Sequence, residues 1–188
     1  MSDLIFITHP EVSVDPNRPI PDWSLSATGR ARATTFATSQ VMKDVTALWS
    51  SAEAKARETA AILADATSLT PQVEATLGEN DRSATGFLPP ERFEQAADLF
   101  FAHPTLSFEG WETAKEAQKR IVSAVTKIVA GHHDGALAVV SHGAVGTLLY
   151  CYLAGLPISR AYDQPSQGHY WTATLSGLKP HHAWQSID

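Results

Sequence analysis

Two short apolar runs, far apart in the chain, both stop at a histidine. The first covers residues 4–8 and is followed by His9, and the second covers residues 137–141 and is followed by His142. Apolar runs that are rich in β-branched residues and broken by proline or glycine are typical of buried strands in a parallel sheet. Ligands of such sheets bind beyond the carboxyl ends of the strands, so we expect both imidazoles to face one crevice.

The rest of the chain alternates between strand-like runs and segments whose apolar residues recur at helical spacing. The clearest helix is predicted for residues 111–130, whose apolar side chains share one face and which Gly131 ends. Ser26 fits the N-cap of a helix over residues 25–42. Further strands are predicted at residues 46–49, 71–75, 136–141, 169–175 and 181–187, and further helices at residues 91–101 and 144–153.

Residues 50–53, with the sequence Ser-Ser-Ala-Glu, match a capping box at the end of the second predicted strand. In this motif the serine side chain bonds to an amide of the first helical turn, and the glutamate side chain bonds to the serine amide. We therefore expect Ser50 and Glu53 to cap the next helix, whose apolar stripe contains Ala56, Ala60 and Leu63.

The alternation of strands and helices predicts the fold class. Strands joined through helices by right-handed crossovers give a three-layer α/β/α sandwich, with a mostly parallel central sheet and helices on both faces. We expect residues 1–188 to form a single domain. Residues 11–23 form a proline-containing loop after the first strand, and residues 78–109 are predicted to be an insertion that caps the site.

Composition and charge narrow the classes of partner. A net charge of -6 argues against a basic surface for nucleic acid or an anionic membrane, so we expect neither as a partner. The single cysteine, Cys151, cannot form an internal disulfide, and no apolar run approaches the roughly 20 residues that span a bilayer. No secretory signal is recognised, so a cytoplasmic location is expected.

Five short motifs occur in an order that resembles a known family. They are Thr-His-Pro at residues 8–10, a Leu-Ser-Ala-Thr-Gly helix start at residues 25–29, the segment 50–60, Ser-His-Gly at residues 141–143, and Gly-Leu-Pro at residues 155–157. The chain resembles the histidine phosphatase superfamily, also called phosphoglycerate mutase-like. In that family the first motif reads Arg-His-Gly, and the third reads Ser-Ser-Pro-Leu-x-Arg-Ala-x-Gln-Thr-Ala.

The resemblance implies a reaction and a role for three residues. His9 matches the nucleophile that forms a phosphohistidine, and His142 matches the second histidine, which stabilises charge on the phosphoryl oxygens. Glu79 is the best match for the carboxylic acid that protonates the leaving group, with Asp81 second. The implied substrate is a small phosphorylated metabolite, and the scheme requires no metal and no cofactor.

The chain departs from the family pattern at the positions that bind phosphate. Thr8 stands in place of an arginine, so one charge-assisted interaction worth about 1.5–3 kcal/mol is missing. Lys55 aligns with a second arginine and supplies charge without the planar fork. Arg18 is a candidate replacement, and Arg57 and Arg82 are further candidates.

Pro10 replaces a glycine and loses an amide hydrogen, but its carbonyl can still accept a hydrogen bond from the His9 imidazole and fix its tautomer. Asn17 lies where family members often carry a polar phosphate contact. The expected substrate-binding residues are Thr8, Asn17, Arg18, Lys55 and Gly143.

Two functions remain open at this stage. One is a metal-independent phosphomonoester hydrolase, and the other is a catalytically degenerate member that binds a phosphate ligand or a protein. A mutase is less expected, because mutases of this family carry long insertions. Serine hydrolases, nucleotide kinases and dinucleotide enzymes lack their motifs here, and the histidine pairs 132–133 and 181–182 complete no metal-ligand set.

Overall fold

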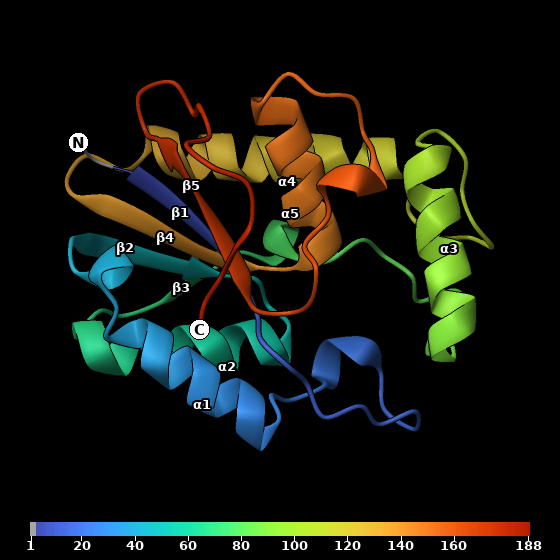
Figure 1. The fold of residues 1–188 in the computed structure, drawn as a ribbon, viewed down its shortest axis with the longest axis horizontal. Helices are drawn as coiled ribbons and strands as arrows, with labels where there is room; N and C mark the ends of the chain where they lie inside the picture. The colour runs from blue at the N-terminus through green and yellow to red at the C-terminus, as the bar shows by residue number, and fades with distance from the viewer. Residues whose placement is uncertain (1–2) are drawn as a thin grey trace.

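The computed structural model describes residues 3–188, which form a six-stranded sheet between two layers of helices (Figure 1). The strands are β1 (Asp3–Thr8), β2 (Val45–Ser50), β3 (Gln72–Val73), β4 (Ala136–Ser141), β5 (His169–Thr174) and β6 (Gln185–Ser186). Their order in the sheet is β3-β2-β4-β1-β5-β6. The first four strands in this order are parallel to one another, whereas β5 runs antiparallel to both of its neighbours. The predicted mostly parallel sheet is confirmed.

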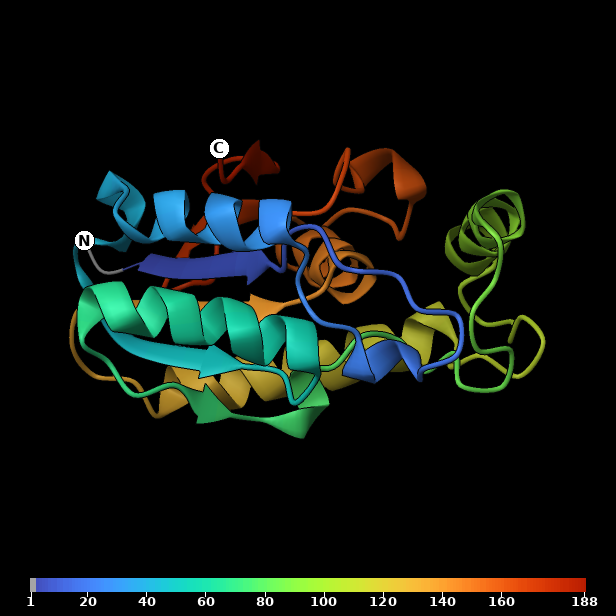
Figure 2. The same cartoon turned by 90° about the horizontal axis from the view of Figure 1, so that it is seen from below.

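The helices lie on both faces of the sheet, which confirms the predicted sandwich (Figures 1 and 2). The α-helices are α1 (Ala27–Ala37), α2 (Ala54–Thr67), α3 (Pro90–Ala102), α4 (Ala114–Ala130) and α5 (Gly143–Leu153), and the short 3-10 helices are η1 (Ile20–Asp22), η2 (Gln40–Met42), η3 (Ala75–Leu77) and η4 (Arg160–Tyr162). Helices α1 and α2 cover one face, α4 and α5 cover the other, and α3 lies beyond the end of the sheet. No helix within residues 3–188 is both long and apolar enough to cross a membrane.

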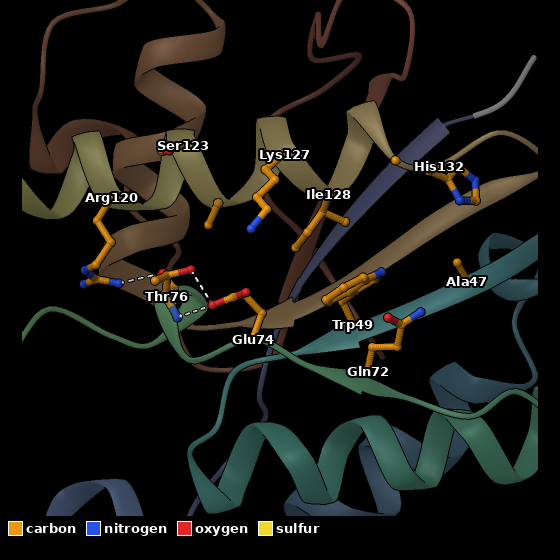
Figure 3. Close-up of a pocket in the computed structure, with 12 residues that line it drawn as sticks. Ala47, Trp49, Gln72, Glu74, Thr76, Arg120, Ser123, Lys127, Ile128 and His132 are labelled. Carbon is orange, nitrogen blue, oxygen red and sulfur yellow. Dashed lines mark hydrogen bonds between the residues drawn. The ribbon is translucent and has the colours of Figure 1, made fainter.

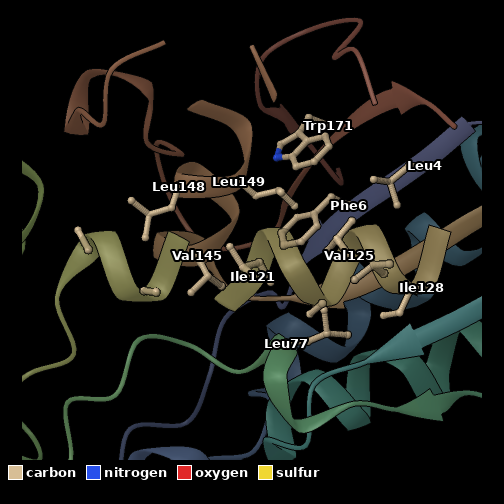
Figure 4. Close-up of a cluster of buried hydrophobic side chains, with 14 of the residues drawn as sticks. Leu4, Phe6, Leu77, Ile121, Val125, Ile128, Val145, Leu148, Leu149 and Trp171 are labelled. Carbon is tan, nitrogen blue, oxygen red and sulfur yellow. The ribbon is translucent and has the colours of Figure 1, made fainter. Parts of the chain in front are cut away.

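The apolar run of β1 supplies both halves of the core, because successive side chains of a strand point to opposite faces. Leu4 and Phe6 belong to the cluster beneath α4 and α5, and Ile5 and Ile7 belong to the cluster beneath α1 and α2. Figure 4 shows the first cluster, in which Phe6 stacks on Trp171 with ring centroids 5.0 Å apart. Burial on both faces explains why the run is continuously apolar.

The register of β1 against β4 places the two histidines at one end of the sheet. Thr8 pairs with Ser141, so the chain leaves both strands at the same level, and the His9 amide donates a hydrogen bond to the Ser141 carbonyl at 3.2 Å. The parallel pairing of β1 and β4 is therefore sufficient to place the backbones of His9 and His142 side by side.

Most predicted elements are present, with altered bounds. Ser26 caps α1 by accepting a hydrogen bond from the Gly29 amide at 3.0 Å, as predicted. The helix predicted over residues 111–130 begins at Ala114, because Thr113 and Glu116 form a capping box there. The strand predicted over residues 181–187 is reduced to β6 among the described residues.

Candidate active site

His9 and His142 lie next to each other beyond the ends of β1 and β4. Their ring centroids are 5.2 Å apart, and the ring planes are inclined at 66°. His9 is 7% exposed, and His142 is fully buried. His9 lines a cavity of about 390 Å³, hereafter the His9 cavity, whose walls come from residues 12–23, α3, the first turn of α5 and residues 160–167. The two imidazoles are adjacent as expected, but only His9 lines the cavity, whereas both rings were expected to face it.

The His9 ring is held by its own backbone neighbour. Its Nδ1 lies 2.9 Å from the Pro10 carbonyl oxygen, which can only accept a hydrogen bond, so Nδ1 carries the proton in the neutral ring. Nε2 makes no hydrogen bond within residues 3–188 and keeps its lone pair. Burial, together with the nearby charge of Lys55, lowers the pKa of His9 to about 4. The side chain is therefore a neutral imidazole at physiological pH, and the expected contact with Pro10 is confirmed.

The His142 ring is bound through its other nitrogen. Its Nε2 lies 2.7 Å from the Ser51 hydroxyl oxygen, which also accepts a hydrogen bond from the Glu53 amide at 3.3 Å. The Ser51 hydroxyl can donate its proton to Nε2, and a neutral ring bound in this way carries its own proton on Nδ1. This Nδ1 is buried and has no partner among the described residues. Burial lowers the pKa of His142 well below its ordinary value.

Glu53 belongs to the site and does not cap α2, so the predicted capping box is wrong. Glu53 occupies the N-cap position, but its side chain makes no capping bond, and Ser50 ends β2 with a hydroxyl that has no hydrogen-bond partner among residues 3–188. The Glu53 carboxylate forms an ion pair with Lys55 and lies 3.3 Å from Nε2 of His142. Burial opposes ionisation, but the charge of Lys55 and the hydrogen bonds from Lys55 and the Glu79 amide lower the pKa of Glu53 to about 2.

Glu79 sits at the N-terminus of α5. Its carboxylate accepts hydrogen bonds from the amides of Ala144 at 3.2 Å and Val145 at 3.1 Å, which would otherwise lack partners in the first helical turn. Burial raises the pKa of Glu79, and the nearby charge of Arg82 opposes the shift. Glu79 also lines the His9 cavity, so a carboxyl group with a raised pKa faces the same space as the His9 ring.

The predicted substrate-binding residues fall into two groups. Lys55 and Gly143 line the His9 cavity, although Lys55 already donates to Glu53 and to the Ile20 carbonyl. Thr8 is fully buried and does not line the cavity, because its hydroxyl donates to Gln164 at 2.7 Å. The other four candidates do not line the His9 cavity and are exposed to solvent; they are Asn17, Arg18, Arg57 and Asp81.

The His9 cavity also contains polar residues that no sequence motif predicted. Asn80 follows Glu79 directly, whereas Arg160 begins η4 and Gln164 lies between η4 and β5. Gln164 lies so close to Gly143 that a Cβ there would collide with its amide. Glu53 could have been found from its position just after the end of a parallel strand, which is the rule that identified His9 and His142.

A second cavity, of about 540 Å³, lies between β2, β3 and α4 (Figure 3). Trp49 and Ile128 form apolar walls, and Lys127 faces Glu74 across the opening in this view. The pKa of Glu74 in this cavity is lowered by its hydrogen bonds with Thr76, and the side chain of Arg120 is already bound by Glu112. Within residues 3–188, no group of three or more His, Cys, Asp or Glu side chains is placed to hold a metal ion.

Comparison with known proteins agrees with this geometry. The sequence pattern of the "Histidine phosphatase superfamily (branch 1)" matches residues 4–182. No curated protein matches the chain.

Solved structures share the fold at low sequence identity. Mycobacterial glucosyl-3-phosphoglycerate phosphatase in complex with inorganic phosphate superposes with a TM-score of 0.81 at 20% identity, covering 100% of this chain and 99% of that one. YhfR from Bacillus stearothermophilus gives 0.82 at 22% identity over 100% of both chains. Phosphoserine phosphatase from Entamoeba histolytica gives 0.79 at 16% identity, covering 99% and 98%. From the match over nearly its whole length, the chain belongs to the histidine phosphatase superfamily.

Proposed function

We propose that the protein is a phosphomonoester hydrolase that acts on a small phosphorylated metabolite through a phosphohistidine on His9. One observation carries this proposal: His9 is a neutral imidazole whose Nδ1 is held by Pro10 and whose Nε2 has no partner among the described residues of the cavity. A neutral ring nitrogen with a free lone pair can attack phosphorus. Family membership and the phosphatases among its structural neighbours support the same reaction.

The reaction proceeds in two displacements. Nε2 of His9 attacks phosphorus, the bond between phosphorus and the ester oxygen breaks, and the leaving alkoxide takes a proton from the Glu79 carboxyl. Water then attacks the phosphohistidine and passes a proton to the Glu79 carboxylate, while the bond between phosphorus and Nε2 breaks. Inorganic phosphate leaves, and both side chains return to their starting states. The proposed scheme uses no metal.

His142 assists as a hydrogen-bond donor. In the proposed scheme Ser51 donates to Nε2 of His142, so that Nδ1–H is a buried donor without a partner among the described residues, on the ring that packs against His9. A phosphoryl oxygen that reaches this donor satisfies it and loses part of its negative charge to the hydrogen bond. Such preorganised donors stabilise charge that develops in the transition state.

The test is the release of inorganic phosphate from p-nitrophenyl phosphate and a panel of metabolite phosphomonoesters, with chelator present. We compare the wild type with His9→Ala and with His133→Ala, which removes an exposed histidine outside the site. Turnover that survives chelator, persists in His133→Ala and disappears in His9→Ala supports the proposal. Quenching a reaction with phosphorus-labelled substrate in alkaline detergent, in which phosphohistidine is stable, should leave label on the wild type and none on His9→Ala.

The competing function is the degenerate binding module. If wild-type protein is folded but releases no phosphate from any substrate in the panel, the hydrolase proposal is wrong. Turnover that is lost with chelator would instead contradict the metal-independent scheme.

A further inference from the structure

Three cationic side chains line the His9 cavity, and two of them are already paired. Lys55 is bound by Glu53 and the Ile20 carbonyl, and Arg160 forms ion pairs with Glu94 and Asp98 of α3. Arg82 has no carboxylate within 4.0 Å and makes no side-chain hydrogen bond within residues 3–188. It is therefore the cavity cation whose donors are available for a ligand.

Arg82 packs against an aromatic ring of α3. Its Cζ lies over the Phe93 ring, 4.8 Å from the ring centre. This contact leaves the N–H groups of the guanidinium without a hydrogen-bond acceptor in the described part of the chain, and two such groups can bind one phosphoryl group side by side. Arg82 also lines an adjoining cavity of about 490 Å³ and so stands where the two spaces meet.

Asn80 supplies a second donor in the same segment. Asn80 is 5% exposed, lines both cavities, and its Nδ2 has no acceptor among the described residues. A buried N–H without an acceptor is unfavourable, and most such groups in folded proteins have a partner. An anionic oxygen bound between the two cavities would provide the missing acceptor.

We propose that Arg82 and Asn80 form the subsite that binds the phosphoryl oxygens of the substrate, with Arg82 as the charged clamp. This inference rests on the proposed phosphatase function and places the clamp in the 78–86 segment, away from Thr8 and Lys55. The charge of Arg82 also contributes to the lowered pKa of His9 and opposes the rise in the pKa of Glu79, as expected for a guanidinium near both groups.

The test compares Arg82→Gln with Arg57→Gln, which removes the same charge from an exposed position on α2. We measure kcat/KM for p-nitrophenyl phosphate and, separately, the affinity for inorganic phosphate by titration calorimetry. Arg82→Gln should lower both quantities by about ten- to a hundredfold, the range expected for one lost charge-assisted pair. Arg82→Lys should recover part of the loss, because a point charge replaces the fork. Asn80→Ala should give a smaller loss of phosphate affinity.

The two measurements separate this inference from the proposed function. If wild type binds phosphate but does not turn over, the phosphatase proposal fails while the effect of Arg82→Gln on affinity still tests the clamp. If Arg82→Gln stays within twofold of Arg57→Gln in both measurements, and circular dichroism shows that both variants are folded, the clamp is elsewhere. Loss of binding in Asn80→Ala but not in Arg82→Gln would likewise overturn the assignment of Arg82.

Discussion

His9 and His142 follow similar sequence patterns, but their ring nitrogens make different contacts and have different proposed roles. Each follows a buried apolar strand and a hydroxyl side chain, and their two strands are paired in register. His9 holds Pro10 with Nδ1 and makes no hydrogen bond through Nε2 within the described residues, whereas His142 holds Ser51 with Nε2 and is closed off from solvent. The partner of His9 is the next residue in the chain, whereas the partner of His142 comes from a distant segment, and these partners separate a candidate nucleophile from a candidate donor.

Replacing each histidine in turn should give the largest contrast. His9→Ala should abolish phosphate release and covalent labelling, because it removes the attacking nitrogen. His142→Ala should lower kcat by about 10²–10³ while labelling of His9 persists, since one preorganised donor is lost. Rapid-quench experiments with labelled substrate, together with steady-state kinetics, measure both effects.

His142 is fully buried, so this contrast needs a folding control. His142→Asn keeps an N–H donor close to the position of Nδ1 and should be less impaired than His142→Ala. Labelling that survives in His9→Ala and disappears in both His142 variants would reverse the assignment of the two rings.

Replacing Glu79 should have the next largest effect on kcat. In the proposed scheme Glu79, and neither histidine, supplies the proton for the leaving group. Glu79→Gln should lower kcat by about 10²–10⁴ for alkyl phosphates, which need a general acid. p-Nitrophenyl phosphate has a good leaving group, so its first displacement should be much less affected. Equal losses for both substrate classes in single-turnover assays would contradict the role of Glu79 as the acid.

The buried histidines should also make the fold sensitive to acid. The pKa of His9 is about 4 in the folded chain against 6.5 for the ordinary side chain, so below pH 6.5 the unfolded chain takes up a proton that the folded chain excludes. Stability is therefore lost as the pH falls through this window, by about 2 kcal/mol for His9 between pH 8 and pH 5. Glu53, with a pKa of about 2, stays ionised in the folded chain throughout.

Urea denaturation of wild type and His9→Asn at pH 8 and pH 5 measures this contribution. The asparagine side chain keeps a donor for the Pro10 carbonyl but does not titrate, so the variant should lose less stability on acidification. A pH dependence equal to that of wild type would mean that burial of His9 contributes nothing to acid sensitivity.

The parts of the molecule that are determined by burial could be predicted from the sequence. The apolar runs before His9 and His142 identify two adjacent parallel strands, because a strand buried on both faces has no polar positions. Because ligands bind at the carboxyl ends of parallel strands, the positions of the two histidines after these runs predict that their rings lie close together. Ser26 at the start of α1 was predictable for the same local reason, since its cap involves only residues close in the chain.

The rest of the site depends on contacts between distant segments. Residues 50–53 fit a local capping motif, but the Glu53 carboxylate gains more neighbours from Lys55, His142 and the Glu79 amide than from its own helix. Thr8 was expected to bind substrate, and its hydroxyl instead bonds to Gln164, 156 residues further along the chain. No periodic pattern in a sequence reports such long-range partners.

Replacing Ser51 should have the smallest effect on kcat, and it tests the proposed proton position on the His142 ring. In the proposed scheme the Ser51 hydroxyl donates to Nε2 of His142 and so places the ring proton on Nδ1, while Glu53 lies 3.3 Å from the same Nε2. In Ser51→Ala the Glu53 carboxylate becomes the remaining partner of Nε2 and favours a proton on that nitrogen. Nδ1 then carries no proton and cannot donate a hydrogen bond. We expect kcat to fall by about tenfold, the cost of one misoriented hydrogen bond, with KM little changed. Ring-nitrogen NMR shifts of His142 should move from the Nδ1–H to the Nε2–H tautomer, whereas those of His9 should stay in place. A drop in kcat without this tautomer change would show that Ser51 acts through packing and not through the His142 proton.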